Sequence, residues 1–311
     1  MTPADFQLLA KFLKDQSGLA LAEDKGYLLE SRLVPVARAH GLKSVDDIAA
    51  EVRAGRNQRL MAAVVEAMTT NESFFFRDIK PFDQFKTIVL PQLLTRRAAT
   101  KQLRIWSAAC STGQEPYTLA MLLTEAAVQL QGWRIEIIAT DIAPGVLAKA
   151  RAGLYSQFEV QRGLPVQMLL KHFSQKAEGW EIAPQLRAMI NFREFNLLSD
   201  MKPLGVFDVV FCRNVLIYFD QRTKGDVLSR IRERIKEDGI LYLGGAETVL
   251  GVSESFRPVT GQRGLYATTD SAGAIWDEAP AAAPRPAPSV GAAPQSAQPA
   301  TAAPLRPAIR A

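Results

Sequence analysis

The sequence is poor in the residues that build disulfide frameworks and zinc sites. It contains two cysteines, Cys110 and Cys212, and two histidines among 311 residues. Two cysteines do not make a disulfide framework in a chain of this length. So small a supply of Cys and His also argues against a zinc centre, and we expect no metal.

Long apolar runs and a strong net charge are also missing. No run of about 18 apolar residues is present, so we expect no membrane-spanning helix. Asp5, Lys11 and Lys14 interrupt the N-terminal segment, which excludes a signal-peptide pattern. The formal net charge of +5 permits an acidic partner but does not demand nucleic acid. We therefore expect a soluble, cytoplasmic protein that neither inserts into membranes nor binds nucleic acid.

The chain is long enough for two domains, and its hydrophobic content of 48% permits a sizeable core. The apolar spacing in residues 1 to about 80 predicts an all-helical segment. Helices are expected at 27–40, ended by Gly41, at 45–53 with Ser44 as N-cap, and at 60–68. Pro35 is expected to kink or divide the first of these.

The stretch 103–123 predicts a strand, a loop of small residues and a helix with Pro116 near its start. This order is the first unit of a nucleotide-binding α/β sheet. The loop is not GxGxxG, because it has only Gly113. Glu115 would repel a pyrophosphate and attract an ammonium group, which favours S-adenosylmethionine over NAD. The alternative is a strand–helix turn without a ligand.

A second candidate ligand residue ends the next predicted strand, 133–140. Asp141 follows that strand, where a carboxylate is placed to bind ribose hydroxyls. The alternative is that Asp141 caps the helix expected near Pro144.

The apolar run 209–212 predicts a buried parallel strand. Arg213, Asn214 and Tyr218 follow it, at the sheet edge where open α/β folds bind ligands. The alternative is a polar loop with a packed tyrosine.

The segment 69–77 joins the helical part to the sheet and mixes three phenylalanines with Asn71, Ser73 and Arg77. The phenylalanines are expected in the core, while the three polar side chains could instead frame a carboxylate. Farther upstream, Arg32, Arg38, His40 and Lys43 occur without an intervening acid. They form either a solvated helix face or a docking face for an acidic helix.

The remaining pattern completes an α/β sheet. Residues 155–190 are expected to be irregular, with small strands near Trp180 and at 189–192. Further elements are a third sheet strand at 192–195, a helix at 222–236, a fifth strand from Gly239, and a hairpin at 256–259 and 264–268. The Pro/Ala-rich tail, 271–311, is expected to be disordered, with Trp276 packed on the domain edge.

Four motifs in this order resemble chemotaxis receptor methyltransferases, the CheR-type protein-glutamate O-methyltransferases. They are TTNESFFFR at 69–77, WSAACSTGQEPY at 106–117, ATDI at 139–142 and FDVVFCRNVLIYF at 207–219. The resemblance runs from near residue 5 to about 269. It implies a helical receptor-recognition domain (1–80), a Rossmann-like S-adenosylmethionine-dependent methyltransferase domain (81–270) and a small inserted β-subdomain (about 172–192).

The resemblance also implies roles for individual residues. Arg77 and Tyr218 would be catalytic, clamping and orienting the substrate carboxylate. The cofactor-binding residues would be Asn71, Ser73 and Arg77 near the methionine end, Glu115 at the amino group, Asp141 at the ribose, Asn196 and Leu197 at the adenine, and Arg213 and Asn214 completing the pocket. The cofactor would leave as S-adenosylhomocysteine.

The implied substrates are glutamates on the cytoplasmic helices of chemoreceptors, docked through Arg32, Arg38 and Lys43. The chain departs from the family at Pro35 and Val36, where other members carry basic residues, and at Ser73, where Thr is common. The segment 172–192 is shorter than in members that bind a receptor C-terminal pentapeptide, so we expect no pentapeptide tethering. We also expect a monomer. Two rivals remain: a methyltransferase for another substrate, such as a small acid or nucleic acid, and a cofactor-binding regulator without turnover.

Overall fold

A computed structural model describes residues 1–270 and 275–276. These residues all belong to one compact unit. No helix among them is long and apolar enough to cross a membrane. The prediction for the tail lies outside the described residues, except at Ile275 and Trp276.

The N-terminal segment is all-helical, as the apolar spacing predicts. Its helices are α1 (Pro3–Ser17), α2 (Gly26–Ala39), α3 (Val45–Ala54) and α4 (Gln58–Met68), with a short 3-10 turn, Glu23–Lys25, before α2. Local sequence sets their ends: Thr2 caps α1, Gly18 ends it in the left-handed region, and Ser44 with Asp47 forms a capping box on α3. The apolar faces meet in a separate core that includes Leu9, Leu33, Ile48 and Val64.

Of the two outcomes predicted at Pro35, division of the helix is wrong, because α2 continues through it to Ala39. Proline removes the N–H that would pair with the carbonyl of Ser31. Ser31 is exposed, so water can satisfy that carbonyl.

The helical character predicted up to about residue 80 ends earlier, at Met68. Residues 69–79 contain no helix and lead from α4 to the sheet-bearing part of the chain. That part opens with α5 (Lys80–Gln84), a π-helical turn (Phe85–Val89) and α6 (Leu90–Arg96). Within the connecting segment Phe75 is fully buried in the core, so the core prediction for the phenylalanines holds there.

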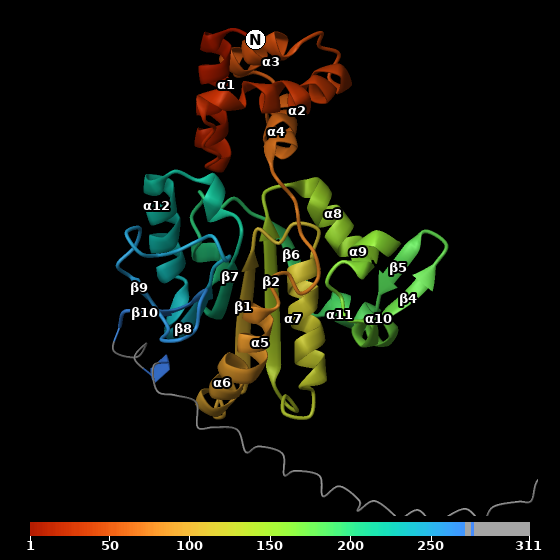
Figure 1. Ribbon diagram of the computed structural model, residues 1–311, viewed down its shortest axis with the longest axis vertical. Helices are drawn as coiled ribbons and strands as arrows, with labels where there is room; N and C mark the ends of the chain where they lie inside the picture. The colour runs from red at the N-terminus through yellow and green to blue at the C-terminus, as the bar shows by residue number, and fades with distance from the viewer. Residues whose placement is uncertain (271–274, 277–311) are drawn as a thin grey trace, which may run out of the picture. The chain divides into compact units, whose positions relative to one another are not determined.

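The main sheet has seven strands in the order β6-β2-β1-β7-β8-β10-β9 (Figure 1). The five parallel strands are β1 (Gln102–Ala108), β2 (Arg134–Asp141), β6 (Ile190–Glu194), β7 (Phe207–Cys212) and β8 (Ile235–Tyr242). The predicted closing hairpin is confirmed as antiparallel β9 (Phe256–Pro258) and β10 (Leu265–Thr268). The chain turns from one half of the sheet to the other between β1 and β7, the position where open α/β sheets bind ligands.

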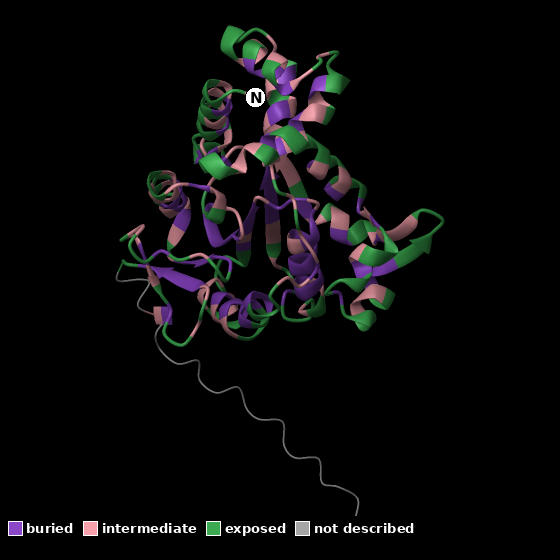
Figure 2. Cartoon of the chain, turned by 45° about the horizontal axis from the view of Figure 1, so that its top comes forward, coloured by how far each residue is buried: buried purple, intermediate pink, exposed green. Residues whose placement is uncertain are grey.

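Helices cover both faces of this sheet. They are α7 (Gln114–Glu125), α8 (Pro144–Ala152) and α12 (Gln221–Arg232), with 3-10 turns at Lys202–Leu204 and Leu216–Tyr218. Neighbouring strand residues point to opposite faces, so Ile105 lies in the core cluster beside α7 and Trp106 in the one beside α12. The central strands are accordingly buried along most of their length (Figure 2).

The small β-subdomain forms, but its predicted limits of 172–192 are wrong. Its three strands are β3 (Leu154–Tyr155), β4 (Phe173–Lys176) and β5 (Gly179–Ile182), in the order β3-β5-β4. The predicted strands at 189–192 and 192–195 are one strand, β6, which pairs with β2 of the main sheet. Residues 155–190 are also not irregular, because they contain α9 (Gln157–Gln161), α10 (Val166–His172) and α11 (Pro184–Ala188).

The helix predicted at 222–236 is too long. It ends at Arg232, and β8 starts at Ile235, which is buried and pairs with Phe207. Pairing with β7 overrides the helical pattern there, because it buries Ile235 in the sheet.

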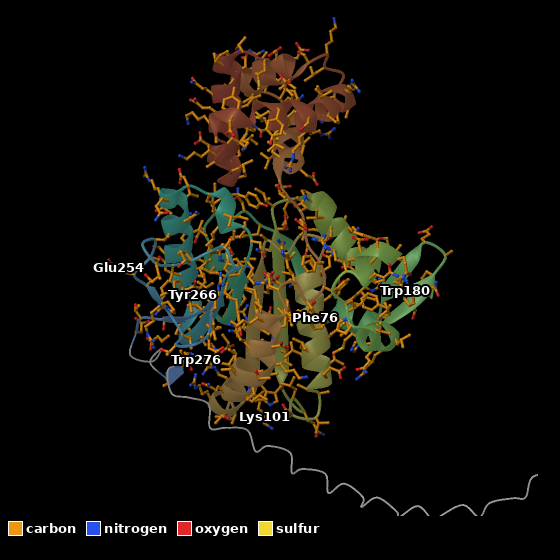
Figure 3. All side chains as sticks on the ribbon, in the orientation of Figure 1. Phe76, Lys101, Trp180, Glu254, Tyr266 and Trp276 are labelled. Carbon is orange, nitrogen blue, oxygen red and sulfur yellow. The ribbon has the colours of Figure 1, made fainter. Side chains whose placement is uncertain are left out.

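Trp276 packs on the domain edge as predicted (Figure 3). Its indole Nε1 donates to the carbonyl of Asp238 at 2.9 Å, and the Arg96 guanidinium lies 4.4 Å from the ring centroid. This contact fixes the last described residue beside Asp238 in β8.

Candidate functional site

A large pocket lies at the carboxyl ends of β1, β2, β6 and β7, at the turning point of the sheet. Its empty space, including the part open to solvent, amounts to about 1030 Å³. All ten residues that the sequence singles out for catalysis or cofactor binding line it: Asn71, Ser73, Arg77, Glu115, Asp141, Asn196, Leu197, Arg213, Asn214 and Tyr218. Five separated segments therefore converge on one site.

The loop after β1 forms the floor of the pocket through an unusual backbone. Ala109 and Ser111 have φ angles of 54° and 52°, in a region that non-glycine residues rarely adopt, and Gly113 has 93°. A Cβ on Gly113 would approach the Ala150 Cβ to 2.9 Å, so glycine there permits close contact with α8. Backbone strain of this kind is concentrated at binding sites, where surrounding contacts maintain it.

Glu115 stands in the first turn of α7 and faces the pocket. One carboxylate oxygen accepts from the Ser107 hydroxyl at 2.7 Å, and the other from Arg213 Nη1 at 2.8 Å. Each carboxylate oxygen has two lone pairs, so acceptor capacity remains for an ammonium group. The pairing with Arg213 was not foreseen from the sequence.

Arg213 is a buried junction between three segments, with 1% of its side chain exposed. Besides Glu115, its guanidinium donates to the Arg77 carbonyl at 2.8 Å and to Asp78 at 2.7 Å. Its Nε is buried without a hydrogen-bond partner among the described residues. A buried donor of this kind is the group that a ligand carboxylate would satisfy.

Asp141 ends β2 and is nearly fully buried in the pocket wall. Its carboxylate accepts the Ser111 N–H at 2.8 Å and the Ala143 N–H at 3.0 Å. Burial raises the pKa of Asp141, while these backbone N–H groups partly oppose that shift. The capping alternative fails, because the N-cap of α8 is Ala143 and no side chain caps that helix.

Glu247, which the sequence analysis missed, organises the loop after β7. Its carboxylate accepts four backbone N–H groups, those of Asn214, Val215, Ile217 and Gly244, at 2.7–3.2 Å. Asn214 is held with φ at 58°. This loop carries Tyr218, which packs against the core cluster beside α12 and also lines the pocket. No local motif marks Glu247, because three of its four partners lie 30 to 33 positions earlier in the chain.

The N-terminal segment also builds the pocket, which the sequence did not predict. Ser17 and Leu19 line it, and the Ala20 N–H donates to the Tyr218 carbonyl at 2.9 Å. Lys14 pairs with Asp220 at 2.5 Å. A Cβ on Gly18 would come within 2.8 Å of the Phe219 ring, so a glycine lets the end of α1 reach this loop.

Asn196 and Leu197 follow β6 at the same sheet edge. The Asn196 amide donates to the Gln16 carbonyl at 2.6 Å, and its oxygen accepts the Leu198 N–H at 2.9 Å. Asn196 thus joins the end of α1 to the sheet while it lines the pocket. Leu197 adds a nearly buried apolar surface, with 7% exposed.

The segment after α4 contributes to both the pocket and the core. Asn71, Ser73 and Arg77 line the pocket, whereas Phe75 is buried in the core. The Arg77 Nη1 donates to the Glu72 carbonyl at 2.6 Å, and its guanidinium lies 5.6 Å from the Phe74 ring centroid. These contacts fix the orientation of the arginine at the pocket wall.

The three residues predicted for substrate docking are not alike. Arg38 and Lys43 are exposed. Arg32 is half-buried, and its guanidinium donates to the carbonyls of Met68 and Thr69. Arg32 is therefore not one of the exposed charges.

Cys110 lines the pocket as a buried thiol. Burial raises the pKa of its thiol well above the ordinary value, and the nearby Asp141 and Glu115 carboxylates add to the shift. The neutral thiol contributes packing to the floor.

The fold and pocket are those of an S-adenosylmethionine-binding methyltransferase, and family models agree. Residues 4–69 match "CheR methyltransferase, all-alpha domain", and residues 71–265 match "CheR methyltransferase, SAM binding domain". The two models meet within the segment that follows α4. The chain therefore belongs to the CheR methyltransferase family, as the four motifs indicated.

Curated relatives place it among the methyltransferases of chemotaxis. "Chemotaxis protein methyltransferase Cher2" of Pseudomonas putida is 38% identical over 265 residues, covering 84% of this chain and 96% of the relative. "Chemotaxis protein methyltransferase 1" of Pseudomonas aeruginosa is 40% identical over 266 residues with the same coverages. A Borreliella burgdorferi chemotaxis protein methyltransferase is 32% identical, covering 81% and 90%. The protein is an S-adenosylmethionine-dependent methyltransferase of chemotaxis.

The residues present fit that cofactor. Glu115 offers acceptors to an amino group, Asp141 offers acceptors to hydroxyls, and the buried Nε of Arg213 offers an unused donor. The strained loop after β1 allows a ligand to approach the backbone closely.

Proposed function

We propose that the protein transfers the methyl group of S-adenosylmethionine to glutamate side-chain carboxylates of chemoreceptors, giving methyl esters. The supporting observation is the composition of the pocket wall. Among its described residues, Arg77 and Arg213 supply positive charge, Tyr218 supplies a hydroxyl, and neither histidine nor lysine occurs; its carboxylates are Glu72, Glu115 and Asp141. This set suits an anionic substrate that needs no deprotonation.

The chemistry of a carboxylate explains why such a wall suffices. A glutamate side chain has a reference pKa of about 4.3 and is ionised near neutral pH, so no general base is needed. When bound, the cofactor supplies an electrophilic methyl group on a sulfonium with a neutral leaving group. The chain's own task is to align the carboxylate oxygen and to exclude water from both charges.

Arg77 and Tyr218 are the proposed catalytic residues. Arg77 has donors beyond the one used on the Glu72 carbonyl, and a guanidinium binds a carboxylate through two parallel hydrogen bonds. Tyr218 has no hydrogen-bond partner for its hydroxyl among the described residues, so that hydroxyl is free to donate to the substrate. The ester product has lost the glutamate charge, which changes the packing of receptor helices.

The other proposed assignments concern the cofactor. They are Asn71, Ser73 and Arg77 for the methionine end, Glu115 for the amino group, Asp141 for the ribose, Asn196 and Leu197 for the adenine, and Arg213 and Asn214 for closure of the pocket. Ser73 keeps the hydroxyl of the threonine common in the family.

Transfer of tritiated methyl groups to receptor-containing membranes tests the function. We expect base-labile radioactive methanol, which a methyl ester releases and a methylated amine does not. Arg77→Ala is expected to lose most of the rate, whereas Arg56→Ala, which removes an exposed arginine outside the pocket, is expected to keep it. Radioactivity that is stable to base would show another substrate. So would radioactivity found only in nucleic acid or in small acids. No transfer at all with the cofactor bound would favour a regulator without turnover.

Receptor docking is proposed to use the methylation helices themselves, through Arg38 and Lys43. The β-subdomain offers little for a tethered peptide, because β4 has four residues and its hairpin turns tightly at Ala177 and Glu178. Exposed charge contacts are screened, so methylation is expected to fall as salt rises.

A receptor lacking its last residues distinguishes the two docking modes. We expect it to be methylated like the full-length receptor, and we expect Arg38→Glu/Lys43→Glu enzyme to have a higher KM on both. A large loss on truncation, with little effect of charge reversal, would contradict the proposal.

A further inference from the structure

Arg32 differs from its basic neighbours on α2 because its guanidinium is used inside the protein. Its Nη1 donates to the carbonyls of Met68 at 2.8 Å and Thr69 at 2.9 Å, and its Nη2 to the Thr70 hydroxyl at 3.2 Å. The last carbonyls of a helix lack partners within it, and a cation stabilises that end. Arg32 therefore fixes how the chain leaves α4.

The segment that Arg32 holds is part of the pocket wall. Met68, Thr69, Thr70 and Asn71 all line it. The Thr69 hydroxyl accepts from the Asn71 amide at 3.0 Å. These are successive residues, so their positions depend on the geometry at the end of α4.

Hydrogen bonds also connect this segment to the pocket floor. The Asn71 carbonyl accepts from the Ser111 hydroxyl at 2.8 Å, and the Ser111 N–H donates to Asp141 at 2.8 Å. A continuous set of contacts thus leads from α2 to the carboxylate at the end of β2.

A second contact secures α4 independently of Arg32. The Glu66 carboxylate accepts the Gly145 N–H at the start of α8 at 2.8 Å. Loss of the Arg32 guanidinium should therefore loosen residues 69–71 while α4 stays in place.

We propose that Arg32 is a positioning residue of the cofactor pocket, which acts through the 68–71 segment rather than by docking the receptor. This role concerns binding of S-adenosylmethionine and does not depend on the identity of the methyl acceptor. It also couples α2, the helix that carries Arg38, to the pocket wall.

Calorimetry with S-adenosylhomocysteine and no receptor tests the proposal. We expect Arg32→Ala to weaken binding roughly tenfold, as for the loss of a charged hydrogen bond. Arg32→Lys should recover part of the affinity, since an ammonium can reach one carbonyl but lacks the planar fork. Arg59→Ala, which removes an exposed arginine of α4 outside the pocket, should bind like the parent enzyme.

Hydrogen exchange of the cofactor-free enzyme separates positioning from general structure. Amides in the 69–73 segment should exchange faster in Arg32→Ala, while those of α1 and α3 keep the parent rates. Parent-like affinity for Arg32→Ala would overturn the proposal. So would faster exchange throughout the helical segment, because the affinity loss would then reflect unfolding.

Discussion

Removal of the Glu247 carboxylate should disturb the loop after β7, which carries Tyr218. The carboxylate accepts the N–H groups of Asn214 and Gly244 on one oxygen, at 2.8 and 2.7 Å. The other oxygen accepts those of Val215 and Ile217, at 3.0 and 3.2 Å. Glu247→Gln keeps the shape of the side chain but offers an amide oxygen on one side only.

The expected cost follows from which N–H groups lose their acceptor. The amide oxygen should take the two shorter bonds, which leaves the NH₂ group facing Val215 and Ile217. Ile217 is 42% exposed and its N–H can turn to water, whereas Val215 is only partly exposed. One orphaned donor costs roughly 1–3 kcal/mol, and weaker bonds to a neutral acceptor add to this. We therefore expect destabilisation of about 1–3 kcal/mol.

Guanidinium unfolding and single-turnover methyl transfer measure the two consequences. For Glu247→Gln we expect a lower unfolding midpoint and a slower methyl-transfer rate, since Tyr218 lies in this loop. Glu254→Gln is the matched control, because Glu254 is exposed and lies in the region that follows Glu247 (Figure 3). Equal midpoints and rates for the two variants would refute the role given to the Glu247 carboxylate.

Three further predictions concern the pocket. Glu115→Ala and Asp141→Ala should each weaken S-adenosylmethionine binding about tenfold or more, because each removes a charged acceptor; unchanged calorimetric affinity in both would contradict the cofactor assignments. Tyr218→Phe should slow single-turnover methyl transfer while keeping cofactor affinity, and parent-like rates would exclude the hydroxyl from orienting the substrate. Hydroxyl donors favour the ionised form of Asp141, whose pKa in the free enzyme is raised by burial. Cofactor affinity should therefore fall as pH drops through that raised pKa, at a higher pH than an ordinary Asp would give, and Asp141→Asn should lack this component.

The raised pKa of Asp141 also has a consequence for stability. Its folded-state pKa lies above its unfolded value, so its contribution to stability is greatest below the unfolded pKa. That contribution is lost as pH rises through the folded pKa. We expect bound cofactor to oppose this loss, because the proposed ribose contact would stabilise the carboxylate.

Much of the sheet could be predicted from sequence alone. The apolar run before Arg213 and the small residues after β1 are local signals, and they identify strand ends where ligands bind. Charge at Glu115 favoured a cationic cofactor group, and the four motifs identified the family. These features depend on residues that are close together in the sequence, so they can be recognised without the tertiary structure.

Tertiary contacts decided the rest. Pairing of Ile235 with β7 shortened α12, and pairing of Ile190–Glu194 with β2 removed that strand from the β-subdomain. Glu247 and Arg32 carry no motif, because most of their partners are backbone groups 30 to 37 positions away. A backbone N–H or carbonyl is chemically the same at every residue. Only the fold decides which of these groups lie in a loop or at a helix end without a backbone partner. The side chains of Glu247 and Arg32 form hydrogen bonds with such groups beside the pocket.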